Sequence, residues 1–254
     1  MIPYYPLSPE MAHIVHFIFE WAGVMIGVQY YRMLKKRHVP HQQGMFERKT
    51  FAVLIGCILG AGIGNKLLFV VENPLVWQQF GWVSLIFGQT IVGGMLGGLI
   101  GVEIAKKIVG VRESTGDLFV LPLAVGLCVG RVGCYLAGLH DGTFGVATTL
   151  PWGVDFGDGV IRHPTQLYDI VAVLVFVIIL QRYRQRLMVV AGLSFKLFLA
   201  SYLAWRFYID GLKPVPYAYA YGWSGIQWVC LIALMLYLPI VLRDLKCLMV
   251  HHRG

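Results

Sequence analysis

Two arginines in otherwise apolar segments are the residues whose type and position most strongly predict chemistry. Arg131 and Arg206 each lie within a stretch long and apolar enough to form a membrane-spanning helix. A charged guanidinium is costly in hydrocarbon, so an intramembrane arginine is a functional-site candidate by default. Both arginines are predicted at the same depth, beside the polar motif RHPTQLY at residues 162–168. The combination predicts a pocket for an anionic lipid headgroup.

Polar side chains from other predicted spans fall at the depth of the two arginines. Glu20, Asn65 and Gln89 lie in the first three spans, and Asp210 lies just beyond Arg206. We expect Glu20, Gln89 and Asp210 to contact a substrate that the arginines hold. The alternative is a set of structural ion pairs, in which Glu20 pairs with one arginine and Asp210 with the other.

His163 is the first candidate for a proton acceptor, and Asp210 and Glu20 are the next candidates. It lies between Arg162 and Pro164, at a polar interface where a helix is predicted to begin. Imidazole groups in general titrate near neutrality and can act as general bases there. The alternative is a helix-entry residue that bonds only to the backbone.

The composition places the chain among polytopic membrane proteins. Of its 254 residues, 57% are hydrophobic and 13% are charged, and the mean hydropathy is +0.68. These values lie outside the range of soluble globular proteins. The net charge of +8 follows from basic residues in the predicted cytoplasmic turns, so no nucleic-acid partner is expected. The five cysteines are scattered singly, which predicts neither a disulfide framework nor a metal site.

Seven segments are long and apolar enough to cross a bilayer, which predicts an all-α integral membrane protein with one transmembrane domain, residues 1–254. The predicted spans are approximately Met11–Arg32, Thr50–Val71, Val83–Ile108, Asp117–Leu139, Thr165–Gln181, Val190–Gly211 and Ser224–Leu245. Most of the 21 Lys and Arg residues fall in turns on one side. The positive-inside rule then places the N-terminus outside and the C-terminus in the cytoplasm. We expect the longest outer segment, at about residues 140–164, to be an ordered loop.

Two predicted spans carry glycines at helical spacing. The third span contains the run GGMLGGLIG, and the second contains Gly56, Gly60 and Gly64. Glycines three and four residues apart leave one helix face almost bare, which favours close helix packing. A phosphate-cradling role is not indicated, because the lysine and serine of a P-loop are missing.

Two motifs resemble the prolipoprotein diacylglyceryl transferase family. They are GRVGCYLAG at residues 130–138 and HPTQLYD at residues 163–169. The family signature pairs a Gly-Arg-x-Gly segment with a downstream His-Pro-Ser-Gln-Leu-Tyr-Glu. The third-span glycine run and the segment WRFYID at residues 205–210, with Lys213 after it, are also similar to family segments. With the seven spans and the outward N-terminus, the resemblance covers nearly the whole chain.

The resemblance implies a bacterial inner-membrane enzyme whose site faces the periplasmic side. Such an enzyme transfers the diacylglyceryl group of phosphatidylglycerol to the thiol of a lipobox cysteine in a prolipoprotein, without a metal or organic cofactor. The resemblance assigns Arg131 and Arg206 to the donor phosphate, in agreement with their depth. A guanidinium fork would both position that phosphate and stabilise charge on the leaving group. The other substrate contacts that it implies are Gly133, Gly142, Gln166 and Tyr168.

Several positions depart from the family pattern. A histidine usually precedes the third-span glycine pair, but Val92 or Leu96 takes its place here. Cys134 stands where the family has asparagine, the Asn-Gly-Glu segment is AGL at residues 137–139, and Ala22 is nearest to a first-helix tyrosine. Two alternatives therefore stay open. One is a transferase that uses an anionic phospholipid with a sugar, a small alcohol or a non-lipobox protein as acceptor. The other is a non-enzymatic lipid binder or transporter.

Overall fold

The computed structural model describes residues 2–38, 48–114 and 116–251. Nearly all regular structure in these residues is helical, as the apolar segments predict. The single transmembrane domain expected from the sequence stays a prediction, and the residues of the structure group into two compact units. The first unit comprises Met1–His38, Thr115–Pro214 and Leu234–Gly254, and the second comprises Val39–Ser114 and Val215–Ala233.

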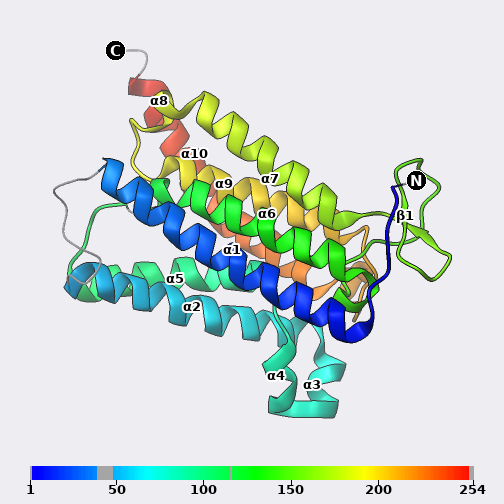
Figure 1. Cartoon of the computed structure of the whole chain (residues 1–254). Coiled ribbons are helices and arrows are strands. Elements are labelled where there is room, and N and C mark those ends of the chain that lie inside the picture. The colour runs from blue at the N-terminus through cyan, green and yellow to red at the C-terminus, as the bar shows by residue number, and fades with distance from the viewer. Residues whose placement is uncertain (1, 39–47, 115, 252–254) are drawn as a thin grey trace. The chain divides into compact units, whose positions relative to one another are not determined.

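Long helices that pack side by side form the first unit (Figure 1). They are α1 (Pro9–His38), α6 (Val120–Ala137), α7 (Thr165–Arg182), α9 (Leu193–Asp210) and the C-terminal part of α10 (Gly225–His251). Helices α1 and α6 approach closely because glycines lie between them. A Cβ on Gly23 would be 2.7 Å from the carbonyl oxygen of Gly126, and a Cβ on Gly133 would be 2.5 Å from Cβ of Phe19. This close packing buries the part of α6 that carries Arg131.

The start of α9 is fixed by side chains from distant parts of the chain. Asp117, in the short helix η2 (Asp117–Phe119), accepts hydrogen bonds from the backbone N–H groups of Gly192 (2.5 Å) and Ser194 (3.1 Å). These donors belong to the first turn of α9, so the Asp117 carboxylate caps that helix. Close by, Lys196 of α9 forms an ion pair with Asp244 of α10. The preceding helix α7 leads into α9 through the short helix α8 (Arg184–Leu187).

A small hairpin orders the predicted outer loop. Strands β1 (Val154–Asp155) and β2 (Ile161–Arg162) pair in antiparallel fashion. The Asp155 carboxylate accepts hydrogen bonds from the backbone N–H groups of two following glycines, both at positive φ, which closes the turn. The N-terminal segment lies beside the hairpin (Figure 1), where the N–H of Ile2 donates to the carbonyl oxygen of Gly153.

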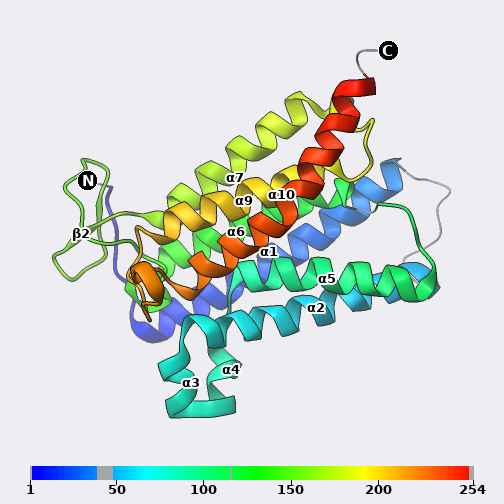
Figure 2. The same ribbon diagram turned by 180° about the vertical axis from the view of Figure 1, so that it is seen from behind.

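The second unit is built around a close pair of helices, α2 (Arg48–Glu72) and α5 (Ile91–Val109) (Figure 2). The predicted glycine runs lie at their contact. A Cβ on Gly60 would be 2.2 Å from the carbonyl oxygen of Gly97, and a Cβ on Gly64 would be 2.3 Å from that of Gly93. The prediction that these glycines serve close helix packing is therefore confirmed.

The predicted third span, Val83–Ile108, is wrong as a single helix. Helix α5 begins only at Ile91, and the segment before it forms a bent arm. The arm and α5 are bent by 63° relative to each other. The elements of the arm are α3 (Pro74–Phe80), η1 (Gly81–Val83) and α4 (Ser84–Phe87).

Two side chains of α2 hold the backbone at this break. Nζ of Lys66 donates to the carbonyl oxygen of Gly88 (2.8 Å), and Oδ1 of Asn65 accepts from the N–H of Thr90 (2.6 Å). Irregular backbone at membrane depth requires such partners, because hydrocarbon offers none. Asn65, a candidate partner of the arginines in the sequence, thus serves the break before α5.

Five helices in the described part of the chain are long and apolar enough to cross a membrane, or up to six if the bent pair is one span. The five begin at Pro9, Arg48, Asp117, Thr165 and Gly225. The predicted sixth span forms α9, which carries Lys196, Arg206 and Asp210 and is not among the five. The chain is therefore a multi-pass, all-α membrane protein. The number of seven spans and the orientation of the termini stay predictions.

Gly60→Ala is expected to destabilise the second unit, because the added methyl group would overlap the carbonyl oxygen of Gly97. We expect a loss on the order of 1–3 kcal/mol, as for other overpacked contacts, seen as a lower Tm in detergent. Gly62→Ala is the matched control on the same helix, because nothing lies within 4 Å of a Cβ there. Alanine has the higher helix propensity, so this control should be neutral or stabilising. Equal Tm values for the two variants would contradict the packing role.

Candidate active site

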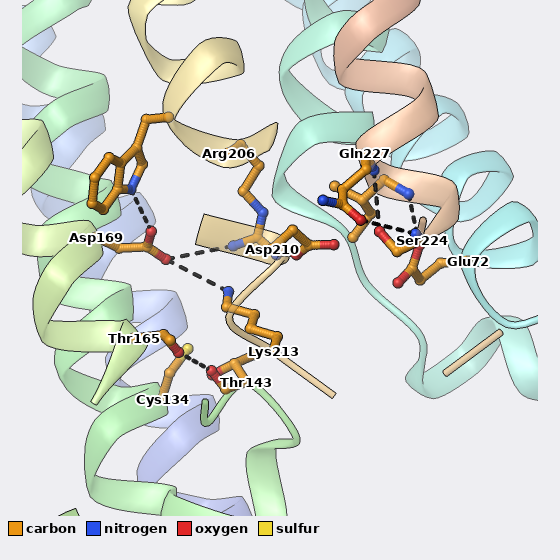
Figure 3. A network of polar contacts seen from close by, with 12 residues as sticks. Glu72, Cys134, Thr143, Thr165, Asp169, Arg206, Asp210, Lys213, Ser224 and Gln227 are labelled. Atoms are coloured by element: carbon orange, nitrogen blue, oxygen red, sulfur yellow. Dashed lines mark hydrogen bonds and ion pairs between the residues drawn. The ribbon is translucent and has the colours of Figure 1, made fainter. Parts of the chain in front are cut away.

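A buried carboxylate, Asp169, lies among three cations in the first unit, and Figure 3 shows it with two of them, Arg206 and Lys213. Its Oδ2 atom is 2.9 Å from Nε of Arg131, 3.5 Å from Nη1 of Arg206 and 3.9 Å from Nζ of Lys213. A second buried carboxylate, Asp210, pairs with Arg206 at 3.0 Å between Oδ1 and Nη2. These five residues are called the arginine cluster below. The two arginines that the sequence singles out therefore converge.

Three helices supply the arginine cluster. Arg131 comes from α6 and Asp169 from α7, while α9 provides Arg206 and Asp210, one helical turn apart on the same face. Lys213 follows in the turn after α9, where its backbone N–H donates to the carbonyl oxygen of Asp210 (3.1 Å). The cluster thus depends on the packing of α6, α7 and α9, and on how α9 ends.

One further contact orients the Asp169 side chain, and another holds the start of its helix. The indole N–H of Trp205 donates to Oδ1 of Asp169 (2.8 Å), which leaves Oδ2 to face the cations. One turn earlier in α7, the hydroxyl of Thr165 donates to the carbonyl oxygen of Thr143 (2.5 Å), and this bond ties the start of α7 to the outer loop (Figure 3). Asp169 is therefore held before any ligand binds.

Part of the hydrogen-bonding capacity around the arginine cluster is not used by the protein. Among the described residues, Nε of Arg206 and Nζ of Lys213 are buried and have no aligned hydrogen-bond acceptor. Gln166 lies three residues before Asp169 in α7 and is 0% exposed, and neither end of its amide has a partner in the same residue set. Buried polar groups are normally paired, and an unpaired one lowers stability. Several of them beside one carboxylate indicate a site for a ligand rich in oxygen atoms.

Lys213 makes the charge of the arginine cluster sensitive to pH. Burial lowers the pKa of Lys213 from 10.5 to about 7, Arg206 acts in the same direction, and Asp169 opposes them. When Lys213 is protonated, three cations and two carboxylates leave a net charge of +1. A bound anion would favour the protonated form of Lys213. The cluster is therefore suited to a singly charged anion.

His163 lies at the start of α7, outside the arginine cluster. Its Nδ1 atom is 3.2 Å from the hydroxyl of Tyr168, which accepts a hydrogen bond from the indole N–H of Trp152 (2.8 Å). The backbone N–H of His163 donates to the carbonyl oxygen of Val146 (3.1 Å). Its imidazole is thus oriented by a tyrosine while its backbone is tied to the outer loop. Both the base and the helix-entry role remain compatible with this arrangement.

The other predicted site residues have different surroundings. Gly133 serves the packing of α6 on α1, and Gly142 has a φ of 69°, in the left-handed region, after the short helix η3 (Gly138–Asp141). Glu20 lies on α1 and is not one of the five cluster residues. Gln89 lies at the break before α5, in the second unit. Their predicted substrate contacts stay predictions.

The sequence reasoning missed Asp169 and Lys213. Asp169 is a carboxylate inside a predicted span, so the argument applied to the arginines would have selected it too. The alternative of structural ion pairs expected Asp210 to pair with one arginine and Glu20 with the other. The pair of Asp210 with Arg206 is present, but Arg131 pairs with Asp169. Lys213 carries no such signal, because its burial depends on the turn after α9.

Comparison with known proteins identifies relatives along most of the chain. The family model described as prolipoprotein diacylglyceryl transferase matches residues 14–243. The chain belongs to this family. Among curated relatives, phosphatidylglycerol–prolipoprotein diacylglyceryl transferase of Geobacter sulfurreducens is 29% identical over 225 residues, covering 80% of this chain and 81% of the relative. The protein of the same name from Methylococcus capsulatus is 29% identical over 255 residues, covering 91% and 93%. That from Wolbachia pipientis of Culex pipiens is 26% identical over 219 residues, covering 80% and 79%.

The motifs that carry the likeness to the diacylglyceryl transferase family meet in the arginine cluster. The segment GRVG contributes Arg131, HPTQLYD contributes Asp169, and WRFYID contributes Arg206 and Asp210. Residues far apart in the chain are thus brought to one carboxylate. Membership of a family of transferases favours an enzyme over a lipid binder without activity.

Proposed function

We propose that the protein transfers the diacylglyceryl group of phosphatidylglycerol, or of a similar anionic phospholipid, to the thiol of a lipobox cysteine in a prolipoprotein. The observation that carries the proposal is the arginine cluster, a buried group of cations with net charge +1 and unused N–H donors inside a multi-pass membrane protein. The relatives are named for two substrates, phosphatidylglycerol and prolipoprotein, and we infer the same pair here.

The donor lipid fits the charge and the donors of the arginine cluster. A phosphodiester carries one negative charge, which balances the net +1 of the cluster. Arg131 and Arg206 offer planar N–H forks to its oxygen atoms, while Lys213 acts as a point charge. The amide of Gln166 both donates and accepts hydrogen bonds, so it suits the hydroxyl groups of a glycerol headgroup.

The transfer is a displacement at a glyceryl carbon of the donor. The acceptor sulfur forms a bond to that carbon, and the bond from the same carbon to the phosphate oxygen breaks. Glycerol phosphate leaves with one more negative charge than the diester had, and Arg131 and Arg206 stabilise this added charge. The thiol proton passes to a base, for which we propose His163. Asp210 is the less suitable base, because its carboxylate already pairs with Arg206.

We place the protein in the bacterial inner membrane, with the arginine cluster toward the periplasmic side. The first unit supports this orientation. The outer-loop hairpin connects the end of α6 to the start of α7. The arginine cluster lies near these same two helix ends and near the end of α9. Basic residues gather at the opposite ends, in the last turns of α1 and around α8, as expected of a cytoplasmic side.

An assay with purified protein tests the proposal. The protein is incubated with phosphatidylglycerol that carries an isotope label, with and without a lipobox peptide, and both released glycerol phosphate and labelled peptide are measured. We expect release only with the peptide, and none when the lipobox cysteine of the peptide is replaced by serine. The acceptor must be tested directly, because either Val92 or Leu96 takes the place of the third-span histidine of the family pattern, and Cys134 takes that of its asparagine. Release with a sugar or an alcohol alone would point to another acceptor, and binding without release would point to a lipid binder.

A further inference from the structure

A second group of polar side chains lies beside the arginine cluster in the first unit. His16 of α1, Cys134 of α6 and Asp141 of η3 each direct one ligand-type atom into a common space, and these atoms all lie within 4.8 Å of one another. Nδ1 of His16 is 2.7 Å from Oδ1 of Asp141. The Asp141 side chain is 2% exposed and Cys134 is buried, whereas the His16 side chain is 34% exposed. The group is therefore enclosed on two sides and open to the surroundings at the imidazole.

We propose that His16, Cys134 and Asp141 form a binding site for a divalent transition metal ion of the zinc type. Imidazole nitrogen, thiolate sulfur and carboxylate oxygen are the three donor classes that zinc takes in proteins. Zinc bonds of about 2.0–2.3 Å in tetrahedral geometry place neighbouring ligand atoms roughly 3.3–3.7 Å apart. The distances in this group, from 2.7 Å to at most 4.8 Å, bracket that spacing. Three protein ligands leave a fourth position for water or another donor.

The charge around the site is compatible with a dication next to Arg131. Bound to a metal, Cys134 is a thiolate and Asp141 a carboxylate, so their two negative charges cancel the charge of the ion. Nη1 of Arg131 is 3.8 Å from Sγ of Cys134, so the guanidinium further favours a thiolate. Arg131 keeps its own counter-ion, Asp169.

The surroundings also supply the secondary contacts that metal ligands need. The hydroxyl of Thr143 donates to Oδ2 of Asp141, which orients the carboxylate. The exposed imidazoles of His13 and His140 have ring centroids 6.4 Å apart. In sequence, His13 is about one helical turn before His16, and His140 directly precedes Asp141. Cys134, where the family motif has asparagine, completes a donor set that this motif does not contain.

Cobalt(II) tests the site, because a cobalt–thiolate bond gives a charge-transfer absorption that histidine or carboxylate ligands do not give. Tag-free protein in detergent is titrated with Co²⁺ while the near-ultraviolet absorption and the bound metal are measured. We expect a saturable thiolate-to-cobalt band at one ion per chain, displaced by Zn²⁺. The band should be absent in Cys134→Ser. His16→Ala and Asp141→Asn should weaken binding by at least about tenfold, the lower end for perturbed metal sites.

Two other cysteines give matched controls. Cys128 is half-buried on the same helix as Cys134, and Cys247 is exposed on α10, four residues before His251. Cys128→Ser and Cys247→Ser should both keep the band. No band in the wild-type protein at saturating Co²⁺ would overturn the proposal, whatever the variants do. A band that persists in Cys134→Ser, or that disappears with either control, would overturn it as well.

Discussion

Arg131→Lys is expected to lose nearly as much transferase activity as Arg131→Ala, on the order of a hundredfold or more. Lysine keeps the positive charge but loses the planar pair of N–H donors that matches phosphate oxygens. It would also leave Asp169 with a shorter partner in place of the Nε contact at 2.9 Å. The same result is expected at Arg206, whose Nη2 atom also holds Asp210. The measurement is kcat/KM for phosphatidylglycerol with a lipobox peptide.

The matched control is Arg243→Lys. Arg243 also pairs with a carboxylate, that of Asp244, but its side chain is 71% exposed and lies on α10, so its replacement should leave kcat/KM unchanged. Each variant is first checked for folding by its Tm and its elution from size exclusion. Full activity of both lysine variants, at positions 131 and 206, would show that charge alone suffices and that the fork geometry has no role.

Substitutions at His163 and Lys213 are expected to affect turnover in different ways. As a base, His163 must accept the thiol proton, which glutamine in its place cannot do. Lys213 loses its proton above about pH 7, and the arginine cluster then loses the charge that matches the lipid phosphate, so activity falls. His163→Gln should fold normally and reduce turnover on the order of a hundredfold. Lys213→Arg should remove the falling limb, because arginine stays charged.

Different outcomes would contradict the two halves of this prediction. A well-folded His163→Gln protein with near-normal turnover would remove His163 from the mechanism and move the search to Asp210 and Glu20. If Lys213→Arg kept the falling limb, another group would cause it.

The stability of the lipid-free protein gives an independent check on Lys213. Its pKa is lower in the folded state than the ordinary 10.5, so unfolded chains bind more protons above about pH 7, and stability should rise with pH there.

Local pattern was sufficient for most of the long helices, but not for the break before α5 or for all of the site. Apolar length predicts α7 almost to the residue, since the expected Thr165–Gln181 is observed as Thr165–Arg182. The break before α5 was missed, because hydropathy cannot show that Lys66 and Asn65 of α2 bind the backbone there. Periodicity and span length do not record which side chain satisfies which backbone group.

The site shows the same division between local and long-range information. Arg131 and Arg206 were identified because a charge in an apolar segment is a local signal. The group of His16, Cys134 and Asp141 was not, because metal sites are recognised in sequence by short spacings, and these residues come from three separate elements. Only the packing of α1 on α6 brings them together.

The unused donors beside Asp169 have a thermodynamic consequence. A buried amide without partners costs about 1–3 kcal/mol, and both ends of the Gln166 amide are in that state. Burial also lowers the pKa of Lys213 in the arginine cluster, so keeping that lysine charged is costly. The lipid-free protein is therefore strained at the point where a headgroup would bond. A donor headgroup bound there would relieve these penalties in addition to forming its own contacts, so we expect the protein to be most stable with the lipid bound. We therefore expect extraction into detergent, which removes anionic lipid, to lower the stability of the helix ends around the site.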